Sequence, residues 1–135
     1  MALHLTKVAF GATSVADLVA RVAARAQQGE VRMTTRFLPK RHVEIEAGGS
    51  LYWIIRHQLV ARAAIRRFEP TPDGRIDIVL DARVMAVQPT PRRAHQGWRY
   101  LEGADAPADL AAMGTGQDDA LPPGLLSELA DLALI

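Results

Sequence analysis

A short arginine- and aromatic-rich segment is the part of the sequence best suited to bind an anionic ligand. Residues 91–100 read Pro-Arg-Arg-Ala-His-Gln-Gly-Trp-Arg-Tyr. Guanidinium groups bind phosphate through two parallel hydrogen bonds, and aromatic rings stack on nucleobases. We therefore predict that RNA or a nucleotide-like ligand is contacted by Arg92, Arg93, Gln96, Trp98 and Arg99. The alternative is a solvated loop in which Trp98 fills the edge of the core.

A second set of basic residues is spread over several elements, and it would line one anion-binding cleft if the fold brings its members together. Arg36, Lys40 and Arg41 are the members that we include in the ligand site. Arg62 and Arg66 share a face whether their segment is a strand or a helix, because their spacing of four suits both periods. The full set is Arg32, Arg36, Lys40, Arg41, Arg62 and Arg66.

Two neighbouring aromatic residues are expected to have different roles. Trp53 shares one face of the strand 50–55 with two apolar residues, which predicts a place in the core. Tyr52 lies on the opposite face together with Arg56, so we include Tyr52 in the ligand site as a stacking surface.

Catalytic and metal-binding motifs are mostly absent. The sequence has no cysteine, which excludes disulfides, thiolate zinc sites and cysteine nucleophiles. His42-Val43-Glu44 has the spacing found in zinc deaminases but lacks the partner cysteines, and we expect neither a metal site nor a cofactor. The phosphate-binding glycine loops of nucleotide-binding domains are also missing. An enzyme acting on a small anionic substrate remains an alternative, with Glu44 as the general base and Ser50 or Thr34 nearby.

Length and composition predict one small domain without a membrane span. The chain has 135 residues, of which 49% are hydrophobic, enough to bury one core. No apolar run approaches the roughly 20 residues of a membrane helix. Residues 1–11 lack the features of a secretory signal, so we expect a cytoplasmic protein.

The net charge of +1 conceals a strong division along the chain. Residues 1–101 hold all 16 basic residues and eight acidic ones, a net charge of +8, whereas residues 102–135 carry seven acids and no base. This asymmetry is typical of a basic body that binds anions and an acidic tail. The tail could cover the basic surface of its own chain. The alternative is that the charges are scattered over solvated faces.

The first third of the sequence predicts a strand, a helix and a second strand. Residues 4–10 alternate as a strand does. Ser14 is expected to cap a helix that ends at Gly29, with Asp17 in the capping-box position. The apolar face of this helix is predicted to comprise Val15, Leu18, Val19, Val22, Ala23 and Ala26. Residues 31–37 alternate again.

The remainder predicts mainly short strands and then helices. Residues 40–47 suit a short helix or a strand, and residues 59–68 a hairpin strand or a helix. Further strands are predicted over 50–55, 75–81, 84–87 and 98–101, with a basic loop over 89–97. Helices are predicted over 106–113 and, after an acidic linker, over 123–134.

This order of elements predicts an α+β domain with short hairpin links. We expect a small mixed or antiparallel β-barrel in residues 1–112, with the N-terminal helix packed on it. Residues 113–135 are expected to form an acidic linker and an amphipathic helix. A third functional alternative is a protein-interaction module, in which that helix docks on a partner or pairs with a second copy as a homodimer.

Three segments together resemble a known family. They are Phe37-Leu38-Pro39-Lys40-Arg41, Gly48-Gly49-Ser50-Leu51-Tyr52-Trp53 and Gln96-Gly97-Trp98-Arg99-Tyr100-Leu101. They resemble the domain-of-unknown-function family numbered 1489, found chiefly in alphaproteobacteria, which brings no established activity.

A weaker similarity is to the ASCH branch of the PUA-like superfamily, carried by Gly29, Arg36 and Gly48-Gly49 before an apolar strand. That similarity implies a small β-barrel that binds RNA or modified nucleosides. Val31 and Arg32 stand where ASCH amidohydrolases have their catalytic Lys and Thr, so it does not imply amidohydrolase activity.

Overall fold

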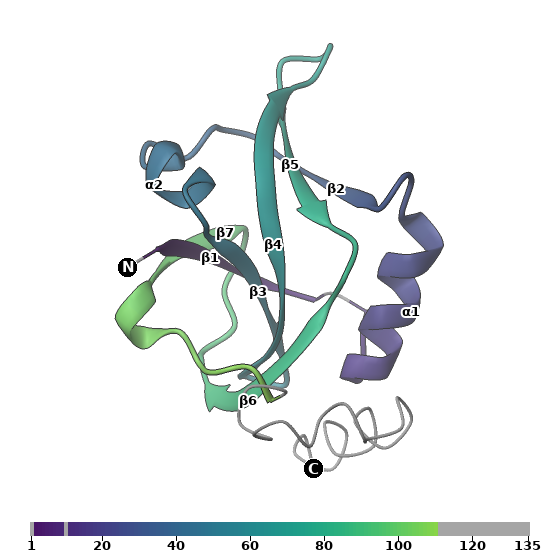
Figure 1. The fold of residues 1–135 in the computed structure, drawn as a ribbon, viewed down its shortest axis with the longest axis vertical. Coiled ribbons are helices and arrows are strands. Elements are labelled where there is room, and N and C mark those ends of the chain that lie inside the picture. The colour runs from purple at the N-terminus through teal and green to yellow at the C-terminus, as the bar shows by residue number, and fades with distance from the viewer. Residues whose placement is uncertain (1, 10, 111–135) are drawn as a thin grey trace.

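A mixed sheet organised around one long strand forms the structure, a computed structural model that describes residues 2–9 and 11–110 (Figure 1). Within these residues the sheet has seven strands in the order β2-β5-β4-β3-β1-β7, with β6 paired to β4. The elements are β1 (Leu3–Val8), α1 (Val15–Arg25), β2 (Glu30–Thr35), α2 (His42–Glu46), β3 (Ser50–Ile55), β4 (Gln58–Pro70), β5 (Ile76–Asp81), β6 (Met85–Pro91), β7 (Trp98–Glu102) and a 3-10 turn (Gly103–Asp105).

Strand β4 holds the sheet together because it pairs with three other strands. Its first half pairs with β3 on one edge and with β6 on the other, and its second half pairs with β5. β1 runs parallel to β3 and antiparallel to β7. The α+β class is confirmed. The predicted barrel is not confirmed, because the sheet is open, with β2 and β7 at its two ends.

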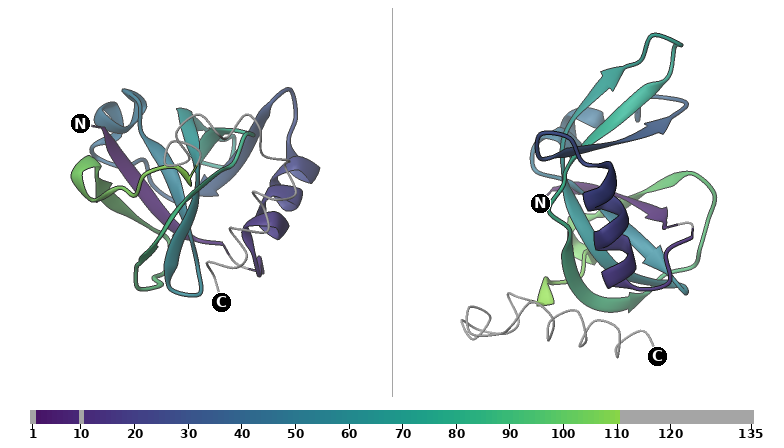
Figure 2. Two further views of the ribbon diagram at one scale, coloured as in Figure 1. Left: turned by 60° about the horizontal axis from the view of Figure 1, so that its bottom comes forward. Right: turned by 90° about the vertical axis from the view of Figure 1, so that its right-hand side faces the viewer.

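The N-terminal helix begins as its capping residue predicts. The Ser14 hydroxyl accepts a hydrogen bond from the Asp17 amide at 3.1 Å, and the Asp17 carboxylate accepts one from the Thr13 amide at 3.1 Å. Figure 2 shows α1 against one face of the sheet. The helix contributes Val15, Leu18 and Val22 to the core, but Val19 is 41% exposed, so the buried face is narrower than predicted.

Apolar side chains cover both faces of the central strands. All six residues of β3 are buried. On one face Leu51, Trp53 and Ile55 belong to the main core, which confirms the prediction for Trp53. On the other face Tyr52 and Ile54 pack in a smaller cluster. Alternation along β3 therefore separates two cores rather than a core from solvent.

The turn before β3 requires a residue without a side chain. A Cβ at Gly49 would lie 2.1 Å from the Leu3 carbonyl oxygen and 2.7 Å from that of Ile45. The glycine therefore lets α2 and β1 approach the start of β3 closely.

Several segments that the sequence left open are decided by the fold. Residues 59–68 lie within the strand β4, and residues 42–46 form the helix α2. The strand predicted over 84–87 extends to Pro91, which shortens the basic loop. The helix predicted over 106–113 is wrong for residues 106–109, which are not helical and instead bring Asp109 into a bridge with Val87. The linker over 113–120 and the helix over 123–134 lie outside the described residues.

Candidate functional site

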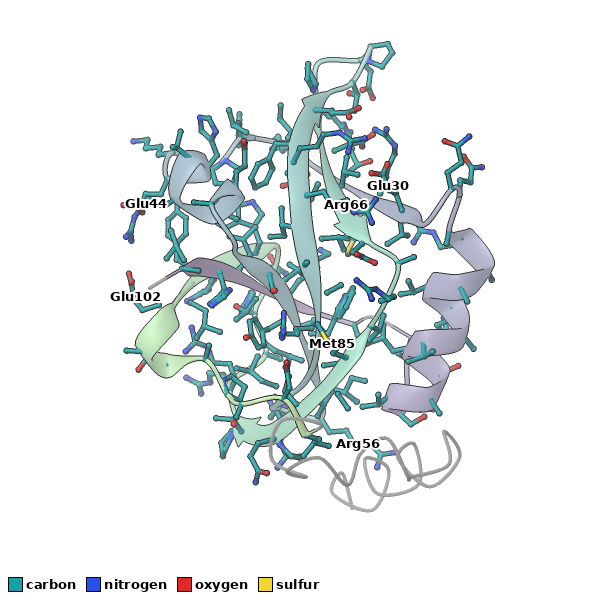
Figure 3. All side chains as sticks on the ribbon, viewed as in Figure 1. Glu30, Glu44, Arg56, Arg66, Met85 and Glu102 are labelled. Atoms are coloured by element: carbon teal, nitrogen blue, oxygen red, sulfur yellow. The ribbon has the colours of Figure 1, made fainter. Side chains whose placement is uncertain are left out.

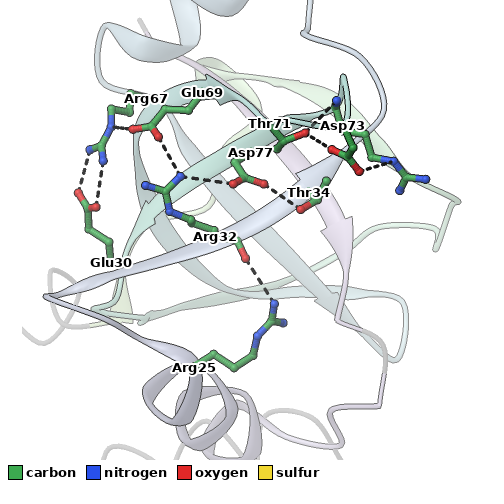
Figure 4. Close-up of polar contacts among 10 residues, drawn as sticks. Arg25, Glu30, Arg32, Thr34, Arg67, Glu69, Thr71, Asp73 and Asp77 are labelled. Carbon is green, nitrogen blue, oxygen red and sulfur yellow. Dashed lines mark hydrogen bonds and ion pairs between the residues drawn. The ribbon is translucent and has the colours of Figure 1, made fainter.

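Most arginines on the strands are neutralised by carboxylates of other elements (Figure 4). Arg32 Nη1 lies 2.9 Å from Glu69 Oε1. Arg67 Nη1 lies 2.8 Å from Glu30 Oε2. Hydrogen bonds from Arg67 and Arg66 lower the pKa of the Glu30 carboxyl to about 2. These charges compensate one another, so this surface carries little net potential to attract an anionic ligand.

A β-bulge brings two consecutive arginines to one carboxylate. The register between β4 and β5 shifts between Ile65 and Arg67, and a bulge interrupts the alternation of side chains. Arg66 and Arg67 therefore both bind Glu30, and Arg66 also lies 3.1 Å from Asp81.

Arg62 belongs to a different, partly buried network. Its Nε and Nη2 groups each lie 2.7 Å from an oxygen of Asp109, and its Nη1 donates to the Ser50 hydroxyl at 2.8 Å. The Ser50 amide in turn donates to His4 Nδ1 at 2.9 Å. Arg62 and Arg66 thus point into separate networks, and the structure does not assemble the cleft that the six scattered basic residues were expected to line.

The residues that would act in an enzyme, Glu44, Ser50 and Thr34, are likewise engaged in separate contacts. Glu44 is ion-paired with Arg41, and the Thr34 hydroxyl donates to Asp77 at 2.8 Å. Ser50 is only 1% exposed, and its hydroxyl accepts from a guanidinium instead of donating to a base. In the part of the chain that the structure describes, these groups do not form a pair of nucleophile and base.

Arg41 is compensated near α2. Its Nη1 lies 3.0 Å from Glu102, and its guanidinium lies 5.5 Å from the centre of the Tyr100 ring. Figure 3 shows Glu44 and Glu102 on the α2 side of the molecule, far from Arg56. The ligand site predicted from the sequence also includes Arg36 and Lys40. Both are exposed in the segment between β2 and α2. Arg92 Nη2 donates to the Tyr100 carbonyl at 3.4 Å, so Arg41 and Arg92 contact different parts of the same residue.

Four other arginines gather where two connections meet. The hairpin between β3 and β4 is hydrogen bonded to the loop between β6 and β7: the Arg92 amide donates to the His57 carbonyl at 2.9 Å, and the Ala94 amide donates to His57 Nδ1 at 3.2 Å. Among the described residues, no ion pair with a carboxylate involves these arginines. We call this region the basic end; it comprises Arg56, His57, Arg92, Arg93, His95 and Arg99.

A buried hydrogen bond fixes the loop of the basic end on the sheet. His95 Nε2 lies 2.8 Å from the hydroxyl of Thr6, which is fully buried in β1. Burial lowers the pKa of His95, and the positive charges of Arg99, Arg92 and Lys7 lower it further. The lowered pKa keeps the imidazole neutral at pH 7, and the contributions of the three cations indicate positive potential at this place.

The predicted aromatic contacts have different outcomes. Trp98 is partly exposed at the start of β7, and its ring lies 5.1 Å from that of Tyr100 in an edge-to-face arrangement. Gln96 is exposed in the same loop. Tyr52 is only 4% exposed and packs against His4, so it offers no surface for stacking.

Sequence reasoning did not include several residues of this region. Arg56 enters the prediction only as a neighbour of Tyr52, and His57, Lys7 and His95 are not among the predicted site residues. A two-residue turn flanked by alternating strands is a recognisable hairpin signal, but its proximity to residues 92–94 depends on the pairing of β4 with β6.

The described residues contain neither a membrane-spanning helix nor a metal-binding cluster. Within residues 2–9 and 11–110, no helix combines the length and the apolar character needed to cross a membrane. The same residues contain no group of three or more histidine or acidic side chains arranged to hold a metal ion.

Comparison with known families agrees with the motifs in the sequence. The family model described as "Protein of unknown function (DUF1489)" matches residues 5–135. The chain belongs to the DUF1489 family. The match includes all the strands from β3 onward and all of the basic end. No curated protein and no solved structure matches this member of DUF1489 significantly.

Proposed function

We propose that this DUF1489 protein binds single-stranded RNA, or a nucleotide-like ligand, through the basic end. One observation carries the proposal: Arg32, Arg62, Arg66 and Arg67 are paired with carboxylates, whereas the arginines of the basic end have no such partner among the described residues. Guanidinium groups without carboxylate partners are available to phosphate oxygens.

The surroundings of these arginines suit a nucleic acid. Trp98 packs against the main core and Tyr100 but is partly exposed, so the exposed part of its ring could stack on a base. His95 holds this loop on β1, because its ring nitrogens are engaged with the Thr6 hydroxyl and the Gln96 carbonyl. The similarity to ASCH domains, which bind RNA or modified nucleosides, agrees with this proposal but does not carry it.

The test is RNA binding by the full-length chain. Fluorescence anisotropy with a labelled RNA single strand would give the dissociation constant. A strand of about 10 nucleotides lies within the site sizes of single-strand binding domains. The double substitution Arg92→Ala/Arg93→Ala should weaken binding about tenfold, because two charge-assisted contacts are lost.

The matched control removes the same amount of charge elsewhere. Arg75 and Arg83 are exposed and paired only with local aspartates, so Arg75→Ala/Arg83→Ala should leave the affinity nearly unchanged. An equal loss in both double variants would mean that net charge alone matters. Absence of RNA binding by the wild-type protein would contradict the proposal.

A further inference from the structure

A cleft lies between α1 and the strands β1, β2 and β3. Its volume is about 440 Å³, within the range of roughly 300–1,000 Å³ that small-molecule sites occupy. Trp53 forms part of its wall, together with Leu18 and Val22 from α1 and Met33 from β2. The lining residues therefore present a largely apolar surface to a ligand.

Small side chains keep this space open. Ala9 and Ala12 line the cleft from the connection between β1 and α1, and Ala24 lines it from the helix. A methyl group does not fill the gap between a helix and a sheet, so the larger residues of the core do not meet across it.

Three cations border the cleft, and none of the described residues that line it is acidic. They are Lys7, Arg21 and Arg25. The Arg21 guanidinium is ion-paired with Asp17 at 3.1 Å and lies against the turn at Gly11, where an added Cβ would be 3.1 Å from Nη1. Arg25 Nη2 donates to the Arg32 carbonyl at 3.4 Å. These contacts use only part of the five N–H donors of each guanidinium, so donors remain for an anion.

The composition of the lining selects the class of ligand. Apart from the three cations, the described side chains that line the cleft are apolar except for the indole N–H of Trp53, and the weakly accepting thioether of Met33 is the only acceptor among them. A nucleobase would present N–H donors that these side chains cannot satisfy, whereas an apolar body with one negative group matches both the walls and the border.

We propose that this cleft binds a small amphipathic anion, an aromatic or aliphatic body carrying one carboxylate, sulfonate or phosphate group. This site is separate from the RNA surface of the basic end, although Lys7 lies near both. The two proposals can therefore fail independently.

Anilinonaphthalene sulfonate is a suitable probe, because it joins an aromatic body to one negative group. In the Trp98→Phe background Trp53 is the single tryptophan of the chain, so energy transfer from Trp53 reports binding of the probe to the protein, and the cleft variants locate the site. We expect saturable binding with such transfer. Replacing Arg21 and Arg25 together by methionine should weaken sulfonate binding roughly three- to tenfold, the effect of one or two exposed ion pairs.

Two comparisons separate this cleft from unspecific binding. The neutral analogue N-phenylnaphthylamine should be insensitive to the methionine substitutions, because it lacks the anionic group. Ala24→Leu should abolish binding of both probes by filling the cleft, whereas Ala20→Leu, on the same helix but outside the lining, should not change it. Circular dichroism would show that both variants remain folded.

Clear results would overturn the proposal. Unchanged sulfonate binding in Ala24→Leu would place the probe elsewhere, and an equal loss in Ala20→Leu would mean that it responds to the helix surface. Equal effects of the methionine substitutions on both probes would remove the anionic preference. Weakening by Arg92→Ala/Arg93→Ala, with the cleft variants unchanged, would assign the probe to the basic end.

Discussion

Two histidines show how burial sets the charge of single side chains in this fold. Burial is the main cause that lowers the pKa of both His4 and His95, and neighbouring arginines act in the same direction. His4 Nδ1 accepts a hydrogen bond from the Ser50 amide, an interaction that only the unprotonated nitrogen can make. The neutral ring is thus part of the buried contact between β1 and β3.

Acid should destabilise the protein through these rings. Above the ordinary histidine pKa of about 6.5, each ring is neutral in both the folded and the unfolded protein. The neutral rings then make their full contribution to the free energy of unfolding. As the pH falls below that value, the unfolded chain takes up protons first, so the free energy of unfolding decreases by at most about 1.4 kcal/mol per pH unit for each ring. His4→Asn retains an acceptor without the titration and should flatten this decrease in urea unfolding between pH 6.5 and 5. An unchanged slope would show that His4 does not contribute.

The hairpin between β3 and β4 has an unusual sequence for its conformation. Arg56 and His57 have φ angles of 52° and 61°, in the left-handed region that two-residue hairpins require and that Asn and Gly adopt at lower cost. A charged residue is therefore placed in a strained turn beside the loop that contains Arg92. Such strain is common where function restricts the choice of residue.

Relieving this strain should separate stability from binding. Arg56→Asn suits the left-handed conformation better, so the free energy of unfolding should stay equal or rise by up to about 1 kcal/mol. RNA affinity should fall severalfold because one guanidinium of the basic end is lost. Thermal or urea unfolding measures the first effect and anisotropy the second. A variant that is less stable than the wild type would contradict the expected effect on stability. A variant with unchanged RNA affinity would contradict the expected effect on binding.

Charge pairing across the whole molecule decides where the positive potential remains. Carboxylates distant in sequence neutralise the arginines of β2 and β4, with separations of 36 to 47 residues for pairs such as Arg66 with Glu30 and Arg62 with Asp109. The loop between β6 and β7 receives no such partner from the described residues. The basic end thus keeps four arginines without carboxylate partners among the described residues, and Arg36 and Lys40 lie exposed in the segment between β2 and α2.

Salt should weaken RNA binding in proportion to the number of phosphates contacted. Each contact with a single strand contributes a slope of about 0.7 in the logarithm of affinity against the logarithm of salt concentration. Four arginines would therefore give a slope of roughly −3, and Arg92→Ala/Arg93→Ala should reduce its magnitude by about 1.4. Binding that does not respond to salt would argue against phosphate recognition.

Local pattern was enough to predict the α+β class, the helix capped by Ser14, the burial of Trp53 and the basic character of residues 92–99, because each depends on neighbours along the chain. The open sheet and the identity of the arginines without carboxylate partners could not be predicted. Strand pairing determines which side chains meet: the parallel pairing of β1 with β3 buries Tyr52, and the shared edge of β4 brings Arg56 beside Arg92. Contacts between residues tens of positions apart leave no periodic signal, so only the tertiary structure decided which cations remain available.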